Sequence, residues 1–282
     1  MNLNRTLKHL NTKQTKQFED SGYHSPVRIL TAQQAMKYRE ILEAYEKKLG
    51  HPVRGPLRTK PHLLFKWVDS LIRNETILDC VEDLIGPDIL CWNTWFWIKE
   101  ANTSSFVSWH QDSQYWGLDT DKLVTAWLAL SPASEDAGCM NVMPGSHLGE
   151  PLDHEDRYHD DNMLTRGQEI VTIDESKAVS MPLKSGEMSI HNIRIAHASG
   201  PNITADRRIG LSMHFMPTNA RQLNAEWDSA SLVRGRDRYG YFEHTPKPAC
   251  DFDPTTVAYH KKATDAMREI LFKGAEKVRP TI

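Results

Sequence analysis

A histidine and an aspartate two residues apart, His110 and Asp112, form the most suggestive chemical pattern in this 282-residue sequence. On a β-strand, side chains two residues apart point to the same side, so both groups could reach one metal ion. Two candidates for a third ligand, His191 and His197, follow far downstream. Two histidines and one carboxylate form the facial triad typical of non-haem Fe(II) oxygenases, which leaves metal positions open for a 2-oxo acid and O₂.

A predicted strand that begins at Arg208 follows His197. In the alternation of a strand, Arg208 shares one face with Gly210, Ser212 and His214. An arginine that points into the interior of a barrel is costly unless an anion pairs with it. The distal carboxylate of 2-oxoglutarate is such an anion, and a guanidinium binds a carboxylate through two hydrogen bonds. The alternative is that Arg208 faces solvent or an internal aspartate.

The pattern of predicted elements places these residues in a β-rich core within one domain. Residues 1–88 are predicted to be mainly helical. Residues 89–220 contain short runs rich in aromatic and β-branched residues, separated by turn signals, which are typical of strands in a sandwich or barrel. Residues 221–282 form a C-terminal extension with one helix. The polar stretch at about 148–178 is long for a loop inside a compact domain, which favours a functional segment.

Helix boundaries are marked in both flanking parts. Thr31 followed by Gln34 is a capping-box pattern that predicts the start of a helix. Gly86 indicates the end of a second helical region. In the C-terminal extension, Asp253 is a predicted N-cap and Pro254 fits the first helical position.

Composition narrows the class of protein. Hydrophobic residues make up 39% and charged residues 25% of the chain, as in ordinary globular proteins. The net charge of -3 gives no sign of a nucleic-acid partner. No apolar run approaches the roughly 20 residues that span a bilayer, so no membrane association is predicted. The first residues lack the apolar centre of a signal peptide, and the expected location is the cytoplasm.

The sequence resembles the phytanoyl-CoA dioxygenase family in four segments, which are WHQD at 109–112, TAWLAL at 125–130, GCMNVMPGSH at 138–147 and HASGPN…RRIGLS at 197–212. The resemblance implies a mainly β protein with a double-stranded β-helix core, also called a jelly-roll or cupin-like fold. N-terminal helices and a C-terminal helix would flank this core. It also implies a dioxygenase that uses Fe(II), 2-oxoglutarate and O₂ to hydroxylate a small molecule and releases succinate and CO₂.

The resemblance also implies roles for individual residues. His110, Asp112 and His197 would bind iron. Arg208 would hold the tail of 2-oxoglutarate, with Ser199 beside it.

Three further residues match cosubstrate positions in relatives, namely Gln111, Trp127 and, in a looser alignment, Lys66. One departure is Ala137, which stands where the family often has an asparagine. This departure affects a loop hydrogen bond and leaves the predicted metal ligands unchanged.

The polar segment at about 148–178 is predicted to be a lid over the substrate. Asn162 and Arg166 in this segment, together with Tyr115 and Trp116 after the metal motif, are the predicted substrate contacts. An acidic loop and scattered arginines favour a compact polar substrate, such as an aminophosphonate or an amino-acid-like compound. An acyl-CoA or a natural-product scaffold is the alternative, and the sequence predicts no oligomeric state.

Three other functions compete with this reading. A halogenase of the same family would carry a small residue in place of Asp112, because chloride must bind the metal there. A non-enzymatic β-barrel could bind a ligand without turnover, but the complete triad and Arg208 argue against it. A cupin-type isomerase or epimerase would need neither Arg208 nor O₂.

Overall fold

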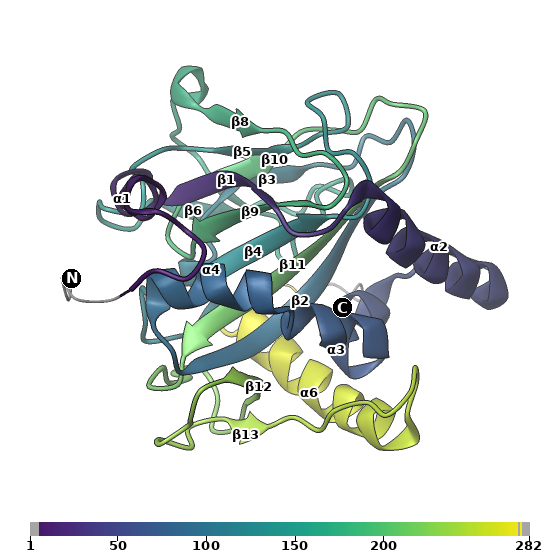
Figure 1. Cartoon of the computed structure of the whole chain (residues 1–282). Coiled ribbons are helices and arrows are strands. Elements are labelled where there is room, and N and C mark those ends of the chain that lie inside the picture. Colours follow the sequence, from purple (N-terminus) through teal and green to yellow (C-terminus); the bar gives the residue numbers. More distant parts are fainter. Residues whose placement is uncertain (1–5, 276, 278–282) are drawn as a thin grey trace.

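Two β-sheets form the centre of the molecule in the computed structural model, which describes residues 6–275 and 277 (Figure 1). The larger sheet has the strand order β1-β9-β4-β11-β2-β12-β13, and the smaller has β3-β10-β5-β8. Neighbouring strands are antiparallel except for the short β12–β13 pair. Two such sheets packed face to face confirm the predicted jelly-roll core.

The strands of the larger sheet are β1 (Tyr23–Arg28), β2 (Ile89–Lys99), β4 (Val124–Ala129), β9 (Glu187–Asn192), β11 (Arg208–Pro217), β12 (Ser229–Arg234) and β13 (Glu243–His244). The smaller sheet contains β3 (Val107–His110), β5 (Met140–Val142), β8 (Val179–Met181) and β10 (His197–Ser199). A separate two-stranded sheet, β6 (His154–Asp156) and β7 (Gln168–Ile170), lies within the predicted lid. The lid segment is therefore partly regular structure.

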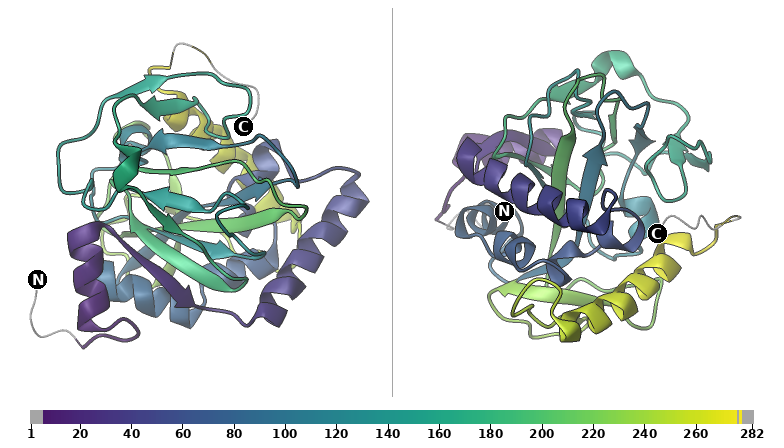
Figure 2. Two further views of the ribbon diagram at one scale, coloured as in Figure 1. Left: turned by 90° about the horizontal axis from the view of Figure 1, so that it is seen from above. Right: turned by 90° about the vertical axis from the view of Figure 1, so that its right-hand side faces the viewer.

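Helices cover the outer face of the larger sheet and one end of the molecule (Figure 2). They are α1 (Thr12–Ser21), α2 (Ala32–Leu49), α3 (Lys66–Ile72), α4 (Glu75–Ile85), α5 (Ser113–Trp116) and α6 (Pro254–Phe272), with short 3₁₀ turns η1 (Gly55–Arg58), η2 (Pro61–Leu63) and η3 (Glu175–Lys177). The predicted caps at Thr31 and Asp253 are confirmed, since both side chains accept backbone hydrogen bonds. The predicted helical part also contributes β1, an edge strand. None of the described helices is long and apolar enough to cross a membrane.

The two faces of β11 differ as the sequence alternation predicts. Leu211, Met213 and Phe215 lie in the main hydrophobic core beneath α3 and α4. Arg208 and Ser212 point the other way, into a pocket between the two sheets. The helices therefore seal one face of the larger sheet and leave the other for a site.

The antiparallel register aligns the pocket-facing residues into rows that cross four strands. One row contains Asn93, His214, Thr125 and His191, contributed by β2, β11, β4 and β9. The next row contains Trp95, Ser212, Trp127 and Ser189. Further along β11, Gly210 lies opposite Trp97, and Arg208 lies opposite Lys99. Side chains within a row are direct neighbours on one face of the sheet.

Gly210 is a glycine because the ring of Trp127 lies across it. A Cβ atom at this position would come within 1.9 Å of Cζ2 of Trp127. The same indole ring lies 5.3 Å from the guanidinium carbon of Arg208. The missing side chain at Gly210 thus lets Trp127 reach the position in which it supports Arg208.

We predict that Gly210→Ala lowers the free energy of unfolding by about 1–3 kcal/mol, because the added methyl group overpacks the wall against Trp127. Chemical denaturation monitored by fluorescence would measure the change. Gly149→Ala is the matched control, since a Cβ at exposed Gly149 meets no atom within 4 Å among the described residues. Equal stabilities for both variants would contradict the role given to Gly210.

Candidate active site

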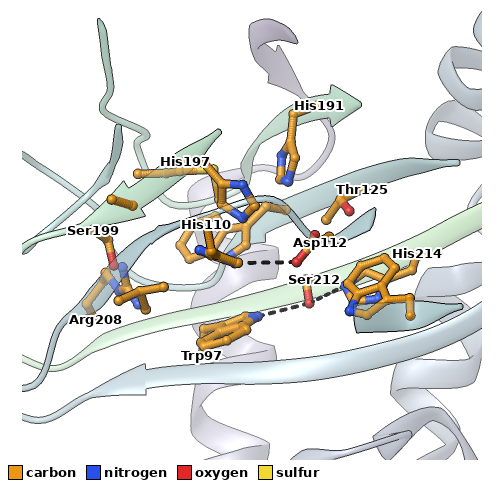
Figure 3. A pocket seen from close by; sticks show the side chains of 15 residues that line it. Trp97, His110, Asp112, Thr125, His191, His197, Ser199, Arg208, Ser212 and His214 are labelled. Atoms are coloured by element: carbon orange, nitrogen blue, oxygen red, sulfur yellow. Dashed lines mark hydrogen bonds and ion pairs between the residues drawn. The ribbon is translucent and has the colours of Figure 1, made fainter. Parts of the chain in front are cut away.

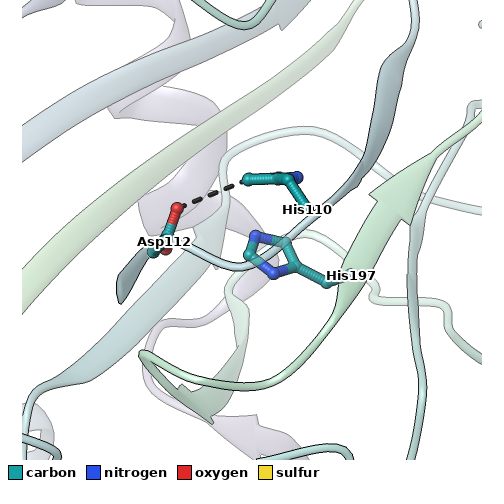
Figure 4. A group of neighbouring side chains, drawn as sticks. All are labelled: His110, Asp112 and His197. Carbon is teal, nitrogen blue, oxygen red and sulfur yellow. Dashed lines mark ion pairs between the residues drawn. The ribbon is translucent and has the colours of Figure 1, made fainter. Parts of the chain in front are cut away.

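Three potential metal ligands converge between the two sheets. His110 ends β3, Asp112 follows it, and His197 begins β10. His110 and His197 are register partners in the antiparallel β3–β10 pair. One ligand atom from each of the three residues lies within 4.8 Å of the others (Figure 4). Residues far apart in the sequence are therefore held together by backbone pairing.

Backbone carbonyls fix the orientation of both imidazoles. Nδ1 of His110 lies 2.9 Å from the carbonyl oxygen of Ser108, and Nδ1 of His197 lies 3.0 Å from that of Ile195. A carbonyl oxygen can only accept, so each Nδ1 carries the proton and donates it. Each Nε2 then keeps a free lone pair, which is the form of histidine that binds a metal.

The charges in this group suit a divalent cation. Burial lowers the pKa values of His110 and His197 to about 4, so both rings are neutral near pH 7. Burial raises the pKa of Asp112 to about 6, because its carboxylate is poorly solvated. Two neutral imidazoles and one buried carboxylate fit a divalent metal such as Fe(II), which would compensate the charge on Asp112.

Arg208 lies in the same pocket and is 2% exposed. Its Nη1 donates a 2.6 Å hydrogen bond to the carbonyl oxygen of Gly138. Its Nε has no hydrogen-bond partner among the described residues. Burial lowers the pKa of Arg208 to about 10, which leaves the guanidinium charged at neutral pH.

A lysine lies beside Arg208 on the neighbouring strand. Lys99 is fully buried, and its Nζ donates a 2.7 Å hydrogen bond to Oγ of Ser199. Burial, followed by the positive charge of Arg208, lowers the pKa of Lys99 to about 6. This end of the pocket therefore combines the positive charge of Arg208 with hydrogen-bond donors, as an anionic group requires.

We call His110, Asp112 and His197 the metal group. The pocket that contains this group and Arg208 is the inner chamber (Figure 3). Its lining residues are Trp97, Val107, His110, Asp112, Trp116, Thr125, Trp127, Met140, His191, His197, Ala198, Ser199, Arg208, Ser212 and His214. A second pocket, the outer chamber, shares four of these residues and lies between β2, the lid segment and α6. It is lined by Asn93, Trp95, Trp97, Asp112, Trp116, Leu164, Thr165, Gln168, His214, Met267 and Leu271.

Comparison with known proteins decides the family. The sequence model of phytanoyl-CoA dioxygenase (PhyH) matches residues 19–210. The chain belongs to the phytanoyl-CoA dioxygenase family. The fold and reaction class that the sequence led us to expect are those of this family of 2-oxoglutarate-dependent non-haem iron oxygenases.

Relatives with known structures or assigned activities support this placement. A probable alpha-ketoglutarate-dependent hypophosphite dioxygenase of Stutzerimonas stutzeri is 26% identical over 227 residues, which cover 74% of this chain and 79% of that protein. The non-heme monooxygenase ThoJ in its apo form is 32% identical, with a TM-score of 0.82 and coverage of 92% of this chain and 98% of that chain. Its nickel complex is 30% identical, with a TM-score of 0.77 and coverage of 92% and 99%.

The structure of this family member brings together most of the predicted metal and cosubstrate residues. Ser199, Trp127 and Arg208 line the inner chamber with the metal group, and Trp116 lines both chambers. His191 also lies in the wall, with its ring centre 4.9 Å from that of His197.

The prediction for Lys66 is wrong. Lys66 is exposed at the start of α3, where its backbone amide donates to the carboxylate of Asp251. The lysine that lies beside Arg208 is Lys99, at the end of β2. Its signal was its register position opposite Arg208, which becomes visible only when the strands are paired.

Gln111 is also misassigned, because it lies between the proposed ligands His110 and Asp112 but points away from both chambers. Its Nε2 donates to the carbonyl oxygen of Arg194, and its Oε1 accepts a 2.8 Å hydrogen bond from the amide of Leu152. Gln111 thus attaches the first part of the lid segment to the metal-bearing strand, outside both chambers.

Three predicted substrate contacts have structural partners instead. Asn162 donates a 2.8 Å hydrogen bond to Oγ of Ser108, and Arg166 pairs with the carboxylate of Asp156. Tyr115 is buried outside both chambers, and the guanidinium of Arg166 lies 5.2 Å from its ring centre. The lid residues that do line the outer chamber are Leu164, Thr165 and Gln168. Local sequence identified the segment but not which of its side chains face inward.

We predict that His197→Ala and Asp112→Ala each weaken Fe(II) binding by more than about 100-fold, since each removes a ligand rather than a supporting partner. Anaerobic calorimetric titration with Fe(II) would measure this. His191→Ala is the informative comparison, because it removes a neighbouring histidine that is outside the proposed ligand set. Loss of the metal in His191→Ala with retention in His197→Ala would show that the ligand assignment is wrong.

Proposed function

We propose that the protein is an Fe(II)- and 2-oxoglutarate-dependent dioxygenase that hydroxylates an unactivated C–H bond of a small molecule. The observation that carries this proposal is the shared inner chamber, in which a two-histidine, one-carboxylate group lies with the buried Arg208. A metal group alone would suit several metalloenzymes. The buried cation adds a site for the far end of a dicarboxylate.

The residues around Arg208 are suited to hold 2-oxoglutarate by its distal carboxylate. The guanidinium has an unpartnered Nε, and the face of Trp127 lies against it. Ser199 lines the same chamber and is oriented by the amino group of Lys99. The 2-oxo acid end of the cosubstrate would then extend toward His110, Asp112 and His197.

Iron bound by this group would supply O₂ activation coupled to decarboxylation of 2-oxoglutarate. In the overall reaction, one oxygen atom enters the substrate as hydroxyl and the other enters succinate, with release of CO₂. The chain contributes a water-poor, aromatic enclosure that positions the C–H bond and limits side reactions. Asp112 occupies the ligand position that a halide would require, which favours hydroxylation over halogenation.

The structure gives little support to an anionic or zwitterionic substrate. No lysine or arginine of the described residues lines the outer chamber. Arg166 pairs with Asp156, Arg234 pairs with Asp79, and Arg221 stacks on Tyr241. An aminophosphonate therefore fits this chamber less well than the natural-product alternative, although one relative is named for hypophosphite.

We predict that Arg208→Ala strongly raises the KM for 2-oxoglutarate. The buried carboxylate of the cosubstrate would lose its charged partner, which costs about 2–5 kcal/mol of binding free energy. Succinate formation at varied 2-oxoglutarate would measure KM, and calorimetry with Fe(II) should show intact metal binding. Arg221→Ala, at an exposed arginine outside both chambers, is the control. An unchanged KM in Arg208→Ala would refute the cosubstrate site.

We also propose that residues 148–178 act as a lid, held closed by Arg166. Its guanidinium pairs with Asp156 and also donates a 3.2 Å hydrogen bond to the carbonyl oxygen of Lys273, just after α6. Arg166 thus connects the two elements that wall the outer chamber on either side. Closing such a lid would exclude water during the reaction.

We expect Arg166→Ala to speed hydrogen exchange in the lid and to increase 2-oxoglutarate consumption that yields no hydroxylated product. Mass spectrometry would follow both the exchange and the products. Arg157→Ala is the control, because Arg157 is in the same segment but is exposed and pairs only with lid carboxylates among the described residues. Identical exchange in the two variants would contradict the proposed clamp.

A further inference from the structure

The row that crosses β2, β11, β4 and β9 consists entirely of buried polar residues without full hydrogen bonding. Asn93, His214, Thr125 and His191 are between 1% and 4% exposed. Among the described residues, no partner exists for Oδ1 of Asn93, Nδ1 of His214, Oγ1 of Thr125 or either ring nitrogen of His191. We call these four residues the polar row. Buried polar groups are usually paired, so four adjacent exceptions require an explanation.

The polar row lies at the other end of β11 from Arg208, although His191, its last member, lies beside the proposed ligand His197 with ring centres 4.9 Å apart. His214 is six residues from Arg208 along β11, which is roughly 20 Å in an extended strand. A five-carbon dicarboxylate anchored at Arg208 ends near the metal group, well before this distance. Three members of the row, His214, Thr125 and His191, line the inner chamber, and Figure 3 shows Thr125 and His214 on the opposite side of the metal group from Arg208. Asn93 and His214 line the outer chamber.

Neighbouring residues add a donor and flat apolar walls. Nε1 of Trp95, in the adjacent row, is buried and has no partner among the described residues. The rings of Trp95 and Trp97 are stacked with centres 5.8 Å apart, and Trp116 stacks on His214 at 4.5 Å. These surfaces suit an aromatic or aliphatic body, while the unpaired atoms suit a group that both donates and accepts hydrogen bonds.

Resting on the proposed oxygenase function, we propose that the polar row recognises an uncharged substrate, in which a carboxamide or hydroxyl group bonds to Asn93, Thr125 and His214. The substrate body lies against Trp95, Trp97 and Trp116 in the outer chamber. Charge argues against an anion, because no lysine or arginine of the described residues lines that chamber and burial lowers the pKa of His214 to about 3. An unpaired amide and hydroxyl favour a neutral partner that satisfies both.

The first test uses stability. Thr125→Val and Asn93→Leu replace unpaired polar groups with apolar groups of similar shape, so each should raise Tm of the ligand-free protein by about 2–4 °C. Thr94→Val is the matched control, since Thr94 is equally buried on β2 but its Oγ1 bonds to His62 at 2.8 Å. This control should lower Tm. A fall in Tm for Thr125→Val equal to that of the control would overturn the proposal.

The second test measures binding to the protein loaded with Fe(II) and 2-oxoglutarate under anaerobic conditions. Phenylacetamide and indole-3-acetamide are the probes, and phenylacetate, indole-3-acetate and 2-aminoethylphosphonate are their charged counterparts. Calorimetry should show binding of at least one amide and weaker binding of every charged compound. Asn93→Leu and Thr125→Val should each weaken binding of the amide by about 10-fold, which is the effect of one lost hydrogen bond. Trp227→Phe, at a surface tryptophan outside both chambers, should bind like the wild type.

Three results would overturn the polar row as a recognition site. The protein could bind only the charged compounds, it could bind neither amide, or all variants could bind the amides with equal affinity. Failure of the oxygenase proposal is recognised separately. It would appear as wild-type protein that forms no succinate from 2-oxoglutarate with Fe(II) and O₂, whichever probe is present.

Discussion

The pairing of β3 with β10 is the constraint on which the rest of the site depends. It places His110 opposite His197, and the carbonyl groups of the same two segments set the orientation of both rings. A shift of one residue in this register would turn a ligand to the opposite face. The lid is attached to the same strand, through Gln111 and through Ser108 with Asn162. Metal group and lid therefore share one structural support.

The pocket-facing side chains of the larger sheet change from charged at one end to neutral and polar at the other. Arg208 places a buried positive charge at one end, with Lys99 beside it, and the polar row places neutral groups at the other. Hydrophobic packing under α3 and α4 fixes the strands, so these side chains cannot relax toward water. Burial then makes each unpaired group costly, and the cost is offset only by a ligand of matching chemistry.

Sequence reasoning succeeded where chemistry follows a strand period and failed where it depends on loops. The His110–Asp112 spacing and the alternation from Arg208 to His214 were readable because a strand repeats every two residues. Lys66 was misassigned because a loose alignment replaced the register that identifies Lys99. Asn162 and Arg166 were misassigned because long-range partners, Ser108 for the first, determine which lid side chains turn inward. No local pattern encodes those contacts.

The separation of charge along the sheet has a consequence for selectivity. An anionic substrate would be attracted to Arg208 and would compete with 2-oxoglutarate for the same cation. An uncharged substrate held by the polar row avoids this competition, because burying a neutral molecule beside Arg208 leaves the guanidinium unpaired. The cosubstrate, in turn, would leave its carboxylate unpaired in the outer chamber. Each end of the pocket would thus reject the ligand of the other, so that cosubstrate and substrate would occupy opposite sides of the proposed metal ligands.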